Sequence, residues 1–236
     1  MIFPAPLRPA RLVRRYKRFL ADVDIDGEIA VAHCPNPGAM LGLDMPGLEV
    51  LLSESANPLR KLRHTLELVR LPSGLVGINT GLPNRLAEEA IRAGRIPELA
   101  GYERIRREVR YGRNSRVDLV LERDGNPPCY VEVKNVHLRR DAGPYPSAAE
   151  FPDCVTARGA KHLVELAAMV AAGARAVMLF IVQRTDCDHF RVAADLDPSY
   201  AAGLAAATAA GVEAICYACH ITEEAIEVDR GLPVML

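Results

Sequence analysis

Tryptophan is missing from this chain of 236 residues, and aromatic side chains make up only 5% of it. A long apolar run is missing too, because the most apolar stretch, residues 166–182, is interrupted by Gly173 and Arg175. That pattern fits a helix followed by a buried strand better than a membrane span. The first residues lack the apolar segment of a secretory signal. We therefore expect a cytoplasmic protein that does not associate with membranes.

The chain also lacks an excess of either charge, since its formal net charge is −1. The overall balance therefore gives no sign of a polyanionic partner. The charges are nevertheless unevenly distributed: the first 19 residues contain six Lys and Arg and no acid, and residues 102–116 contain six arginines against Glu103 and Glu108. Basic stretches of this kind either follow a phosphate backbone or form a solvated face.

The six cysteines are scattered, which favours reduced thiols over a disulfide framework. Cys216, Cys219 and His220 match the C-x-x-C-H pattern of c-type haem attachment. The surrounding AICYACHI is rich in strand-forming residues, and a strand would send the two cysteines to opposite faces. We therefore interpret them as packed thiols.

Short extended runs separated by turns at Gly27, Gly47 and Gly74 fill residues 1–80. The runs are FLADV, EIAVAH, LEVLLS, TLELVRL and LVGINT. Several short strands with Gly and Pro turns are typical of a small β-barrel, and about five strands in this length suit an OB-fold. We predict an N-terminal OB-fold domain over residues 1–82.

Longer elements follow, and we predict a second domain over residues 83–236. Helices are expected at 85–93, 153–172 and 198–210, with Gly94 and Gly211 just after the first and third. EVRYG, RVDLVLE, CYVEVKNV, AVMLFIVQR and VEAICYACHI read as strands. The order of helix, three strands, helix, strand, helix, strand predicts a mixed α/β sheet, so the whole chain is α+β.

The strand CYVEVKNV carries opposite charges on one face. Glu132 and Lys134 alternate with Val131 and Val133, so the two charges point one way and the valines the other. An E-x-K pair on an exposed strand is usually a solvated ion pair, and chance produces the pattern often. The apolarity of this strand favours a chemical role instead.

A second acid is predicted beside this pair. RVDLVLE and CYVEVKNV are joined by a loop centred near Gly125, and opposed residues in an antiparallel hairpin have a constant sum of numbers. A loop over residues 123–127 places Asp118 opposite Glu132, with Cβ atoms about 5 Å apart. A slip of one residue would put the acids on opposite faces, so the register tests this hypothesis.

Two facing carboxylates repel each other unless a cation lies between them. Mg²⁺ is often held by one or two carboxylates, with water and substrate phosphate at its other positions. Such an ion lowers the pKa of a bound water and neutralises charge on a scissile phosphate. Lys134 would orient the nucleophile or stabilise the developing negative charge. Mg²⁺, or Mn²⁺ in its place, is the predicted cofactor.

Basic residues in both predicted domains are candidates for binding a nucleic-acid backbone. The helix after the polar loop opens with Arg158, Lys161 and His162, and its N-terminus suits a phosphate. Arg158, Lys161 and Glu165 are expected on one face opposite the leucines, and a solvated helix face is the alternative. In the barrel, Arg15, Lys17 and Arg18 flank Tyr16, as an OB groove for single strands requires, although one aromatic is a thin stacking platform.

Helix, Asp118, Glu132-Val-Lys134 and the helix–strand continuation resemble the PD-(D/E)XK nuclease core. Further motifs in the same order are RYKRFLADV (15–23), HCPNPGAM (33–40), NRLAEEAI (84–91), SRVDLVL, YVEVKNV and FPDCVTARGAKHLVEL (151–166). Together they resemble the sugar fermentation stimulation protein family, SfsA, over nearly the whole chain. One departure is Pro37, where the family commonly has Ser or Thr. His33 and Cys34 beside it are more plausibly a packed loop than a metal pair, because other ligands at zinc-like spacing are missing.

The resemblance implies an N-terminal OB-fold β-barrel followed by a restriction-endonuclease-like mixed α/β domain. It also implies DNA binding with little sequence specificity, a proposed DNA and RNA nuclease activity, and a proposed role in regulating maltose metabolism. By motif it places metal ligands at Asp118, Glu132 and Glu89, with Lys134 as a catalytic residue. Helical phase alone does not separate Glu88 from Glu89. Gln183 falls where such nucleases often carry a polar active-site residue.

Two functions remain open at this stage. The first is a Mg²⁺-dependent nuclease that holds DNA, with RNA as a further candidate, on the barrel and hydrolyses it in the α/β domain. The second is a non-catalytic DNA-binding regulator whose nuclease-like core has become a binding surface. A sugar-metabolising enzyme lacks support, because the chain contains no Gly-rich phosphate loop. The sequence sets no oligomeric state, so a homo-oligomer stays open.

Overall fold

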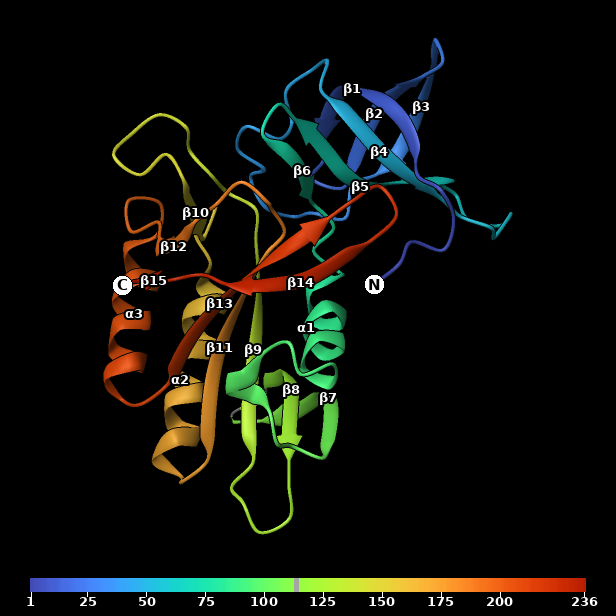
Figure 1. Cartoon of the computed structure of the whole chain (residues 1–236). Helices are drawn as coiled ribbons and strands as arrows, with labels where there is room; N and C mark the ends of the chain where they lie inside the picture. The colour runs from blue at the N-terminus through green and yellow to red at the C-terminus, as the bar shows by residue number, and fades with distance from the viewer. Residues whose placement is uncertain (113–114) are drawn as a thin grey trace.

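The N-terminal strands close into a barrel, as the short apolar runs predict. In this computed structural model, which describes residues 1–112 and 115–236, the barrel neighbours run in the order β3-β2-β1-β4-β5. The ends of β3 and β5 pair through Ala32↔His64 and His33↔Thr65 and complete the circle. Figure 1 shows the barrel packed against one end of the second domain. Its strands are β1 (Arg8–Tyr16), β2 (Leu20–Ile25), β3 (Glu28–His33), β4 (Glu49–Glu54) and β5 (His64–Leu71).

The first barrel strand is absent from the elements that the sequence predicts. β1 alternates exposed arginines with the buried Ala10 and Leu12, whose side chains enter the barrel core. In the sequence these arginines are interpreted only as a basic stretch, so the strand is not predicted. The run LVGINT, predicted as a barrel strand, forms the short β6 (Gly74–Gly77), which extends the sheet from β5. The prediction of an OB-type barrel is confirmed, with a different set of strands.

The second domain is a mixed sheet with helices on both faces (Figure 1). Its strand order is β14-β13-β11-β9-β8-β7, in which β9, β11 and β13 run parallel. Helix α1 (Pro83–Arg92) packs into the core on one face, and α2 (Ala157–Ala171) and α3 (Pro198–Ala209) cover the other. The strands are β7 (Arg104–Tyr111), β8 (Ser115–Glu122), β9 (Cys129–Val136), β11 (Arg175–Val182), β13 (Glu213–Ile221) and β14 (Ile226–Gly231).

Several boundaries differ from the predictions for physical reasons. Helix α2 begins at Ala157 rather than near Asp153, because the Thr156 side chain accepts the Gly159 N–H and caps the helix there. The preceding polar loop contains β10, which was not predicted. It is the edge strand of a small sheet of order β10-β12-β15, in which it pairs with β12. The strands of this sheet are β10 (Ala148–Phe151), β12 (His189–Val192) and β15 (Val234–Met235), and a 3₁₀ turn spans Pro97–Leu99.

The cysteines behave as the strand periodicity predicts. Cys216 lies in the core under α2 and α3, whereas Cys219 lies in the core under α1, so β13 sends them to opposite faces. Both are free thiols. Cys34 is fully buried in the barrel, as a packed loop requires. Among helices in the described part of the chain, none is long and apolar enough to cross a bilayer.

The two domains share buried contacts at the end of the sheet. Phe3 and Leu7 precede the barrel but pack into the core that contains α1. The Gly77 N–H donates to the Gln183 carbonyl at 2.9 Å, which joins β6 to the end of β11. The barrel therefore rests on the carboxyl ends of β9 and β11. Glu132 and Lys134 lie on β9, before this end of the strand.

Candidate active site

The predicted register of the β8–β9 hairpin is confirmed. Leu119 pairs with Val131 and Leu121 with Cys129, so the next residues in line are Asp118 and Glu132. Lys134 lies on the Glu132 side of β9, and its Nζ is 2.7 Å from Glu132 Oε1. The pair projects toward α2, whereas Val131 and Val133 belong to the core under α1.

The two strands separate at the acids. The main-chain ladder ends at Leu119↔Val131, and beyond it the Val133 N–H donates to Asp118 Oδ2 at 2.8 Å. The Asn84 side chain, from the first turn of α1, donates to Asp118 Oδ1 at 2.7 Å. A carboxylate thus takes the place of a strand carbonyl, which holds Asp118 in the opening between β8 and β9.

A twist in the β7–β8 hairpin produces this opening. Ile105, Leu119 and Leu121 pack on the α1 side of the sheet, whereas Val109, Tyr111 and Val117 pack on the α2 side. All six residues have odd numbers. In a regular strand, odd-numbered residues share one face, so in both strands the side chains change face between the two groups. The reversal occurs at Glu108 and Asp118. These two residues lie opposite each other, between the pairs Arg107↔Leu119 and Val109↔Val117. Glu108 has φ of 52°, a left-handed conformation that costs a non-glycine residue about 1 kcal/mol or more.

A chain of polar contacts holds Glu132, which is only 2% exposed. His162 Nδ1 and Lys134 Nζ both contact Glu132 Oε1. Arg158 Nε donates to His162 Nε2 at 3.4 Å, so Nδ1 carries the proton and donates to the carboxylate. The second oxygen, Oε2, is buried and has no hydrogen-bond partner among the described residues. Glu132 therefore presents one occupied oxygen and one free oxygen.

The two carboxylates have opposite pKa shifts. The pKa of Asp118 is raised because the group is buried and because the negative charge of Glu132 lies nearby. Burial also raises the pKa of Glu132, but the hydrogen bond from His162 and the charge of Lys134 outweigh it, so the net shift is downward. Environments that separate two carboxylate pKa values are common where acids share a catalytic task.

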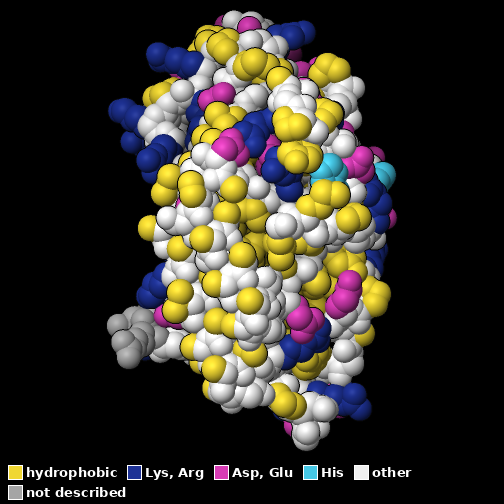
Figure 2. Space-filling model, turned by 90° about the vertical axis from the view of Figure 1, so that its left-hand side faces the viewer, with side chains coloured by type: hydrophobic (Ala, Val, Ile, Leu, Met, Phe, Trp, Pro, Cys, Tyr) yellow, Lys and Arg dark blue, Asp and Glu magenta, His cyan; other side chains and the backbone are white. Residues whose placement is uncertain are grey.

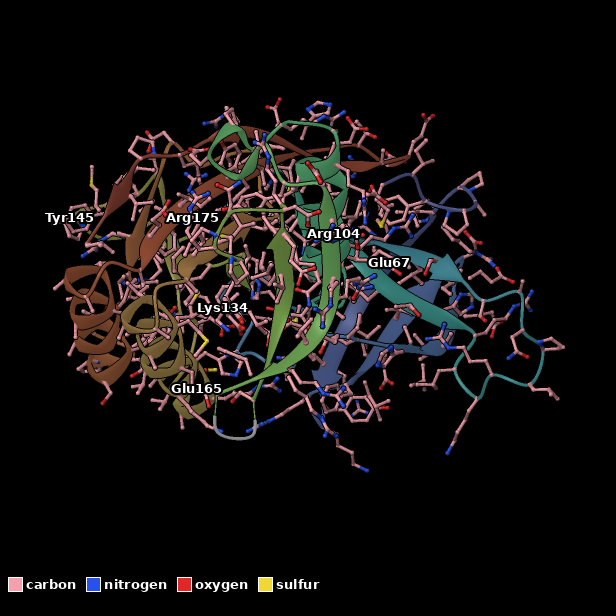
Figure 3. The ribbon with its side chains drawn as sticks, turned by 90° about the horizontal axis from the view of Figure 1, so that it is seen from below. Glu67, Arg104, Lys134, Tyr145, Glu165 and Arg175 are labelled. Atoms are coloured by element: carbon pink, nitrogen blue, oxygen red, sulfur yellow. The ribbon has the colours of Figure 1, made fainter. Side chains whose placement is uncertain are left out.

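Glu165 is expected on the helix face opposite the leucines, with a solvated face as the alternative, and the structure shows that it is buried. It is 7% exposed and lies against the tip of the β7–β8 hairpin, where its Oε1 would be 3.1 Å from a Cβ on Gly112. Lys161 Nζ is 3.7 Å from Glu165 Oε1. In Figure 3 Lys134 and Glu165 both lie between α2 and the strands of the hairpin. Helix α2 has two buried sides, because α3 covers its leucines while His162 and Glu165 face the sheet.

Tyr111 completes the acidic surroundings. Its ring stacks on Tyr130 with centroids 5.8 Å apart, and its hydroxyl is buried without a hydrogen-bond partner in the described residues. The pKa of Tyr111 is raised by burial and then by the charges of Glu132 and Glu165. The Tyr111 hydroxyl therefore lies close to the carboxylates of Glu132 and Glu165 on this side of β9.

The residues present fit a divalent cation that takes few protein ligands. Asp118 and Glu132 offer hard carboxylate oxygens, and the buried Oε2 of Glu132 lacks a donor. Within residues 1–112 and 115–236, no group of three or more His, Cys, Asp or Glu is arranged to hold a metal. An all-protein cage is therefore not the arrangement. Two carboxylates are within the number of protein ligands that a Mg²⁺ ion commonly takes.

Glu89, which the resemblance proposed as a third metal ligand, lies elsewhere. Its carboxylate pairs with the amino group of Met1 at 2.8 Å and with Arg85 at 2.8 Å. Asn84 is the α1 residue that contacts Asp118. Glu88 is one helical turn after Asn84 and pairs with Arg107 of β7, so it lies nearer the hairpin than Glu89 does.

Gln183 sits at the junction of the two domains. It is fully buried, and its Nε2 donates to the Asn79 carbonyl at 3.2 Å and to Asn135 Oδ1 at 2.6 Å. Asn135 Nδ2 lies 2.9 Å from His137 Nδ1, and His137 Nε2 lies 3.3 Å from Asp153 Oδ2. This polar chain extends from the end of β9 to the barrel, so Gln183 joins the site to the domain contact.

Asp153 anchors the barrel loop that contains the HCPNPGAM motif. Its Oδ2 accepts the Met40 N–H at 3.2 Å, and Gly38 packs directly against its carboxylate. Burial raises the pKa of Asp153, but the opposing effects of His137 and the Met40 amide are larger. The net result is a pKa lowered to about 2. Pro37 lies within this docked loop. Loop 33–40 therefore serves as a contact between the domains.

The predicted backbone-binding residues fall into two groups. Arg15 is occupied: its guanidinium donates to the carbonyls of Asn36 at 2.7 Å and Gly38 at 2.8 Å, and so supports the docked loop. His162 is buried against Glu132. Lys17 and Arg18 are exposed at the β1–β2 turn, and Arg18 lies near enough to Cys154, just before α2, to affect its pKa. Arg158 and Lys161 follow on the first turns of α2.

Basic side chains are present at the barrel end of the molecule. Figure 2 shows Lys and Arg side chains projecting from the barrel end of the face that it displays. Arg18 of the barrel lies near the segment that leads into α2, although the two are about 140 residues apart in the sequence. In the sequence, only positive charge indicated that these basic residues could bind a nucleic-acid backbone.

Two family profiles match the chain. The profile described as the SfsA N-terminal OB domain matches residues 13–78, and the sugar fermentation stimulation protein RE domain matches residues 81–225. Curated relatives named sugar fermentation stimulation protein homolog cover nearly all of it. The one from Rhodospirillum centenum is 62% identical and covers 98% of each chain. The one from Maricaulis maris is 57% identical and covers 100% of this chain and 99% of the relative.

A solved structure shares the whole fold. The structure of Pyrococcus furiosus SfsA in complex with Ca²⁺ superposes with a TM-score of 0.89 at 30% sequence identity. It covers 100% of this chain and 98% of the archaeal one. The arrangement of barrel, sheet and helices described above is therefore also that of the archaeal structure.

Proposed function

The chain belongs to the sugar fermentation stimulation protein family, SfsA, and from that premise we propose that it is a divalent-cation-dependent phosphodiesterase acting on nucleic acid. The observation that supports this function is the register that brings Asp118 level with Glu132 where β8 and β9 separate, with Lys134 beside Glu132 and one oxygen of Glu132 without a partner among the described residues. The archaeal relative forms a complex with Ca²⁺, which supports a divalent cation as a ligand of this chain too. Ca²⁺ and Mg²⁺ both prefer oxygen ligands.

Asp118 and Glu132 would hold Mg²⁺ or Mn²⁺ through their carboxylates. The bound ion would supply a water of lowered pKa and neutralise charge on the scissile phosphate. Asn84 and the Val133 amide hold Asp118 in place, and His162 holds Glu132. Neither carboxylate then has to reorganise when substrate arrives.

Lys134 would act on the reacting phosphate. Its ammonium pairs with Glu132 and is mostly buried, with a side chain 14% exposed, so it stays next to the carboxylate oxygens. From there it would stabilise negative charge that develops on the phosphate or orient the attacking water. Glu89 has no part in this proposal, because its carboxylate is paired with Met1 and Arg85. Gln183 would act indirectly, through Asn135 at the end of β9.

A cleavage assay tests the proposal. Purified wild type, Lys134→Ala and Glu132→Gln are incubated with plasmid, single-stranded DNA and RNA, with Mg²⁺, Mn²⁺ or EDTA. We expect cation-dependent cleavage by wild type and a loss of at least about a hundredfold in both variants. Lys61→Ala, on the barrel domain and away from the carboxylates, is the matched control and should cleave like wild type. Equal rates for all proteins would assign the activity to a contaminant, and inactivity of wild type on every substrate would refute the proposal.

Binding without turnover is the second candidate. It is favoured by the absence, in the described residues, of a third His, Cys, Asp or Glu that would complete a metal group. In this case Lys134 and the exposed Lys17 and Arg18 would contact phosphates, and the acids would tune the position of Lys134. Binding that needs no cation and survives Glu132→Gln, with no cleavage product, would select this function over the first.

A further inference from the structure

The β7–β8 hairpin consists of two halves that differ in how its arginines are paired. We call the part beyond the twist the tip half, made of Val109–Tyr111 and Ser115–Val117, and the part before it the base half. In the base half the arginines pair with acids: Arg104 with Asp124 at 2.7 Å, Arg106 with Glu122 at 3.0 Å, and Arg107 with Glu88 at 3.6 Å. Each of these arginines therefore has an acidic partner, on β8, just after β8 or on α1.

The tip half has the opposite arrangement. Arg110 and Arg116 are direct Cα partners across the two strands, and both are exposed. Neither pairs with an acid in the part of the chain that the structure describes. Like charges directly opposite each other destabilise a strand pair, and an anion that lies between them removes the repulsion. Two guanidinium groups side by side provide donors in the geometry that a phosphate accepts.

The position of the pair relates it to the carboxylates. Arg116 precedes Asp118 by two residues on β8, which is about 7 Å along a strand. Asp118 lies at the twist itself, where the tip half meets the base half, so the arginines and the carboxylate project from adjacent parts of one hairpin. A nucleic-acid strand whose scissile phosphate lies at Asp118 and Glu132 would therefore run past the tip half of the hairpin.

We propose that Arg110 and Arg116 together bind a backbone phosphate of the nucleic acid, on the strand that is cut and next to the scissile phosphate. This inference rests on the proposed nucleic-acid function and adds the residues that hold the substrate beside the reacting group. Phosphate contacts set position and carry no base preference, so the pair would act on any sequence. It would act alongside Lys17 and Arg18 of the barrel, which lie on the other domain.

Charge reversal at one member of the pair tests the proposal. Arg116→Glu converts the facing like charges into an opposite pair, so the melting temperature should rise by about 1–3 °C. Binding of single-stranded and duplex DNA and of RNA is measured by fluorescence anisotropy in EDTA, which prevents cleavage, over a salt series. We expect affinity to fall about tenfold on every sequence and the salt slope to fall by about 0.7–0.9, the value of one phosphate contact.

Matched variants separate this site from a general loss of charge. Arg110→Glu, which reverses the pair from the other strand, should give the same losses, and Arg116→Lys should keep most of the affinity. Arg106→Gln, on the base half, should bind like wild type. Wild-type affinity and salt slope in both reversal variants would overturn the inference and leave the proposed function intact. A wild type that binds no nucleic acid at low salt would refute the proposed function itself.

Discussion

Replacing His162 separates a positioning role in the active site from simple packing. The imidazole makes two contacts: Nδ1 donates to Glu132, and Nε2 accepts from Arg158. In His162→Asn the amide nitrogen is attached to Cγ, as Nδ1 is, so the contact with Glu132 is kept and the one with Arg158 is lost. In His162→Gln the amide is one bond further out, so it reaches toward Arg158 and misses Glu132. The two variants therefore remove opposite contacts.

The magnitude follows from what Glu132 loses. A hydrogen bond to a charged group contributes about 1.5–3 kcal/mol, and Glu132 is buried with only Lys134 to replace the donor. Residues that orient a metal ligand typically change metal affinity by about 10–100-fold. We expect His162→Gln and His162→Ala to bind Mn²⁺ that much more weakly than wild type. His162→Asn should stay within about threefold, because its donor remains in place.

The assay is Mn²⁺ titration by calorimetry, with urea unfolding in EDTA as a second readout. Unfolding should show a loss of about 1.5–3 kcal/mol in His162→Ala and a smaller loss in His162→Asn. Equal Mn²⁺ affinity in the Asn and Gln variants would refute the reasoning, since it would mean that the contact with Glu132 does not matter. Identical stability losses with unchanged affinity would assign His162 to packing alone.

Three further predictions concern the cation and the domain contact. Saturating Mn²⁺, at about 100 times Kd, should raise the wild-type melting temperature by about 5–10 °C; Glu132→Gln should abolish this shift and Glu88→Gln should retain it, and a shift that persists without Glu132 would place the ion elsewhere. Gly38→Ala would put a Cβ 2.8 Å from Asp153 Oδ1, so a urea titration should show a loss of about 1–3 kcal/mol, whereas unchanged stability would mean that the loop is not docked. The pKa of Asp153 is lowered from 3.8 to about 2, so its charge stabilises the fold by about 2 kcal/mol above pH 4 and this contribution is lost as the pH falls through 2. Asp153→Asn should therefore be less stable at pH 7 and equal to wild type near pH 2, and a difference that does not depend on pH would contradict the assignment.

Local features of the sequence were sufficient for the strand bearing the site. The alternation of Glu132 and Lys134 with valines predicts their shared face, and the five-residue loop predicts the register that the Leu119↔Val131 pair confirms. Both follow from strand period and turn length, which depend only on neighbouring residues. The same holds for Cys216 and Cys219, which the strand period alone sends to different cores.

The partners of Glu132 required the tertiary structure. His162 is 30 residues away, and α2 presents two buried sides because it packs between α3 and the sheet. A single amphipathic stripe in the sequence describes only one of them, so the sequence leaves open whether the face with Glu165 is solvated, and the structure shows that the side chain is buried. The barrel strand β1 is similarly not predicted. Its arginines are interpreted as a charged stretch, and their alternation with Ala10 and Leu12 is not used.

The sequence by itself determined the domain types, the acid and amine on β9, and the register that brings Asp118 level with Glu132. The tertiary structure decided which helix residue touches Asp118, which oxygen of Glu132 stays free, and that Glu89 and Arg15 are occupied elsewhere. The division has a physical reason: a strand's period and a short turn are set by adjacent residues. Long-range side-chain partners are instead set by how separate elements pack, and one helical residue of rotation is enough to exchange them.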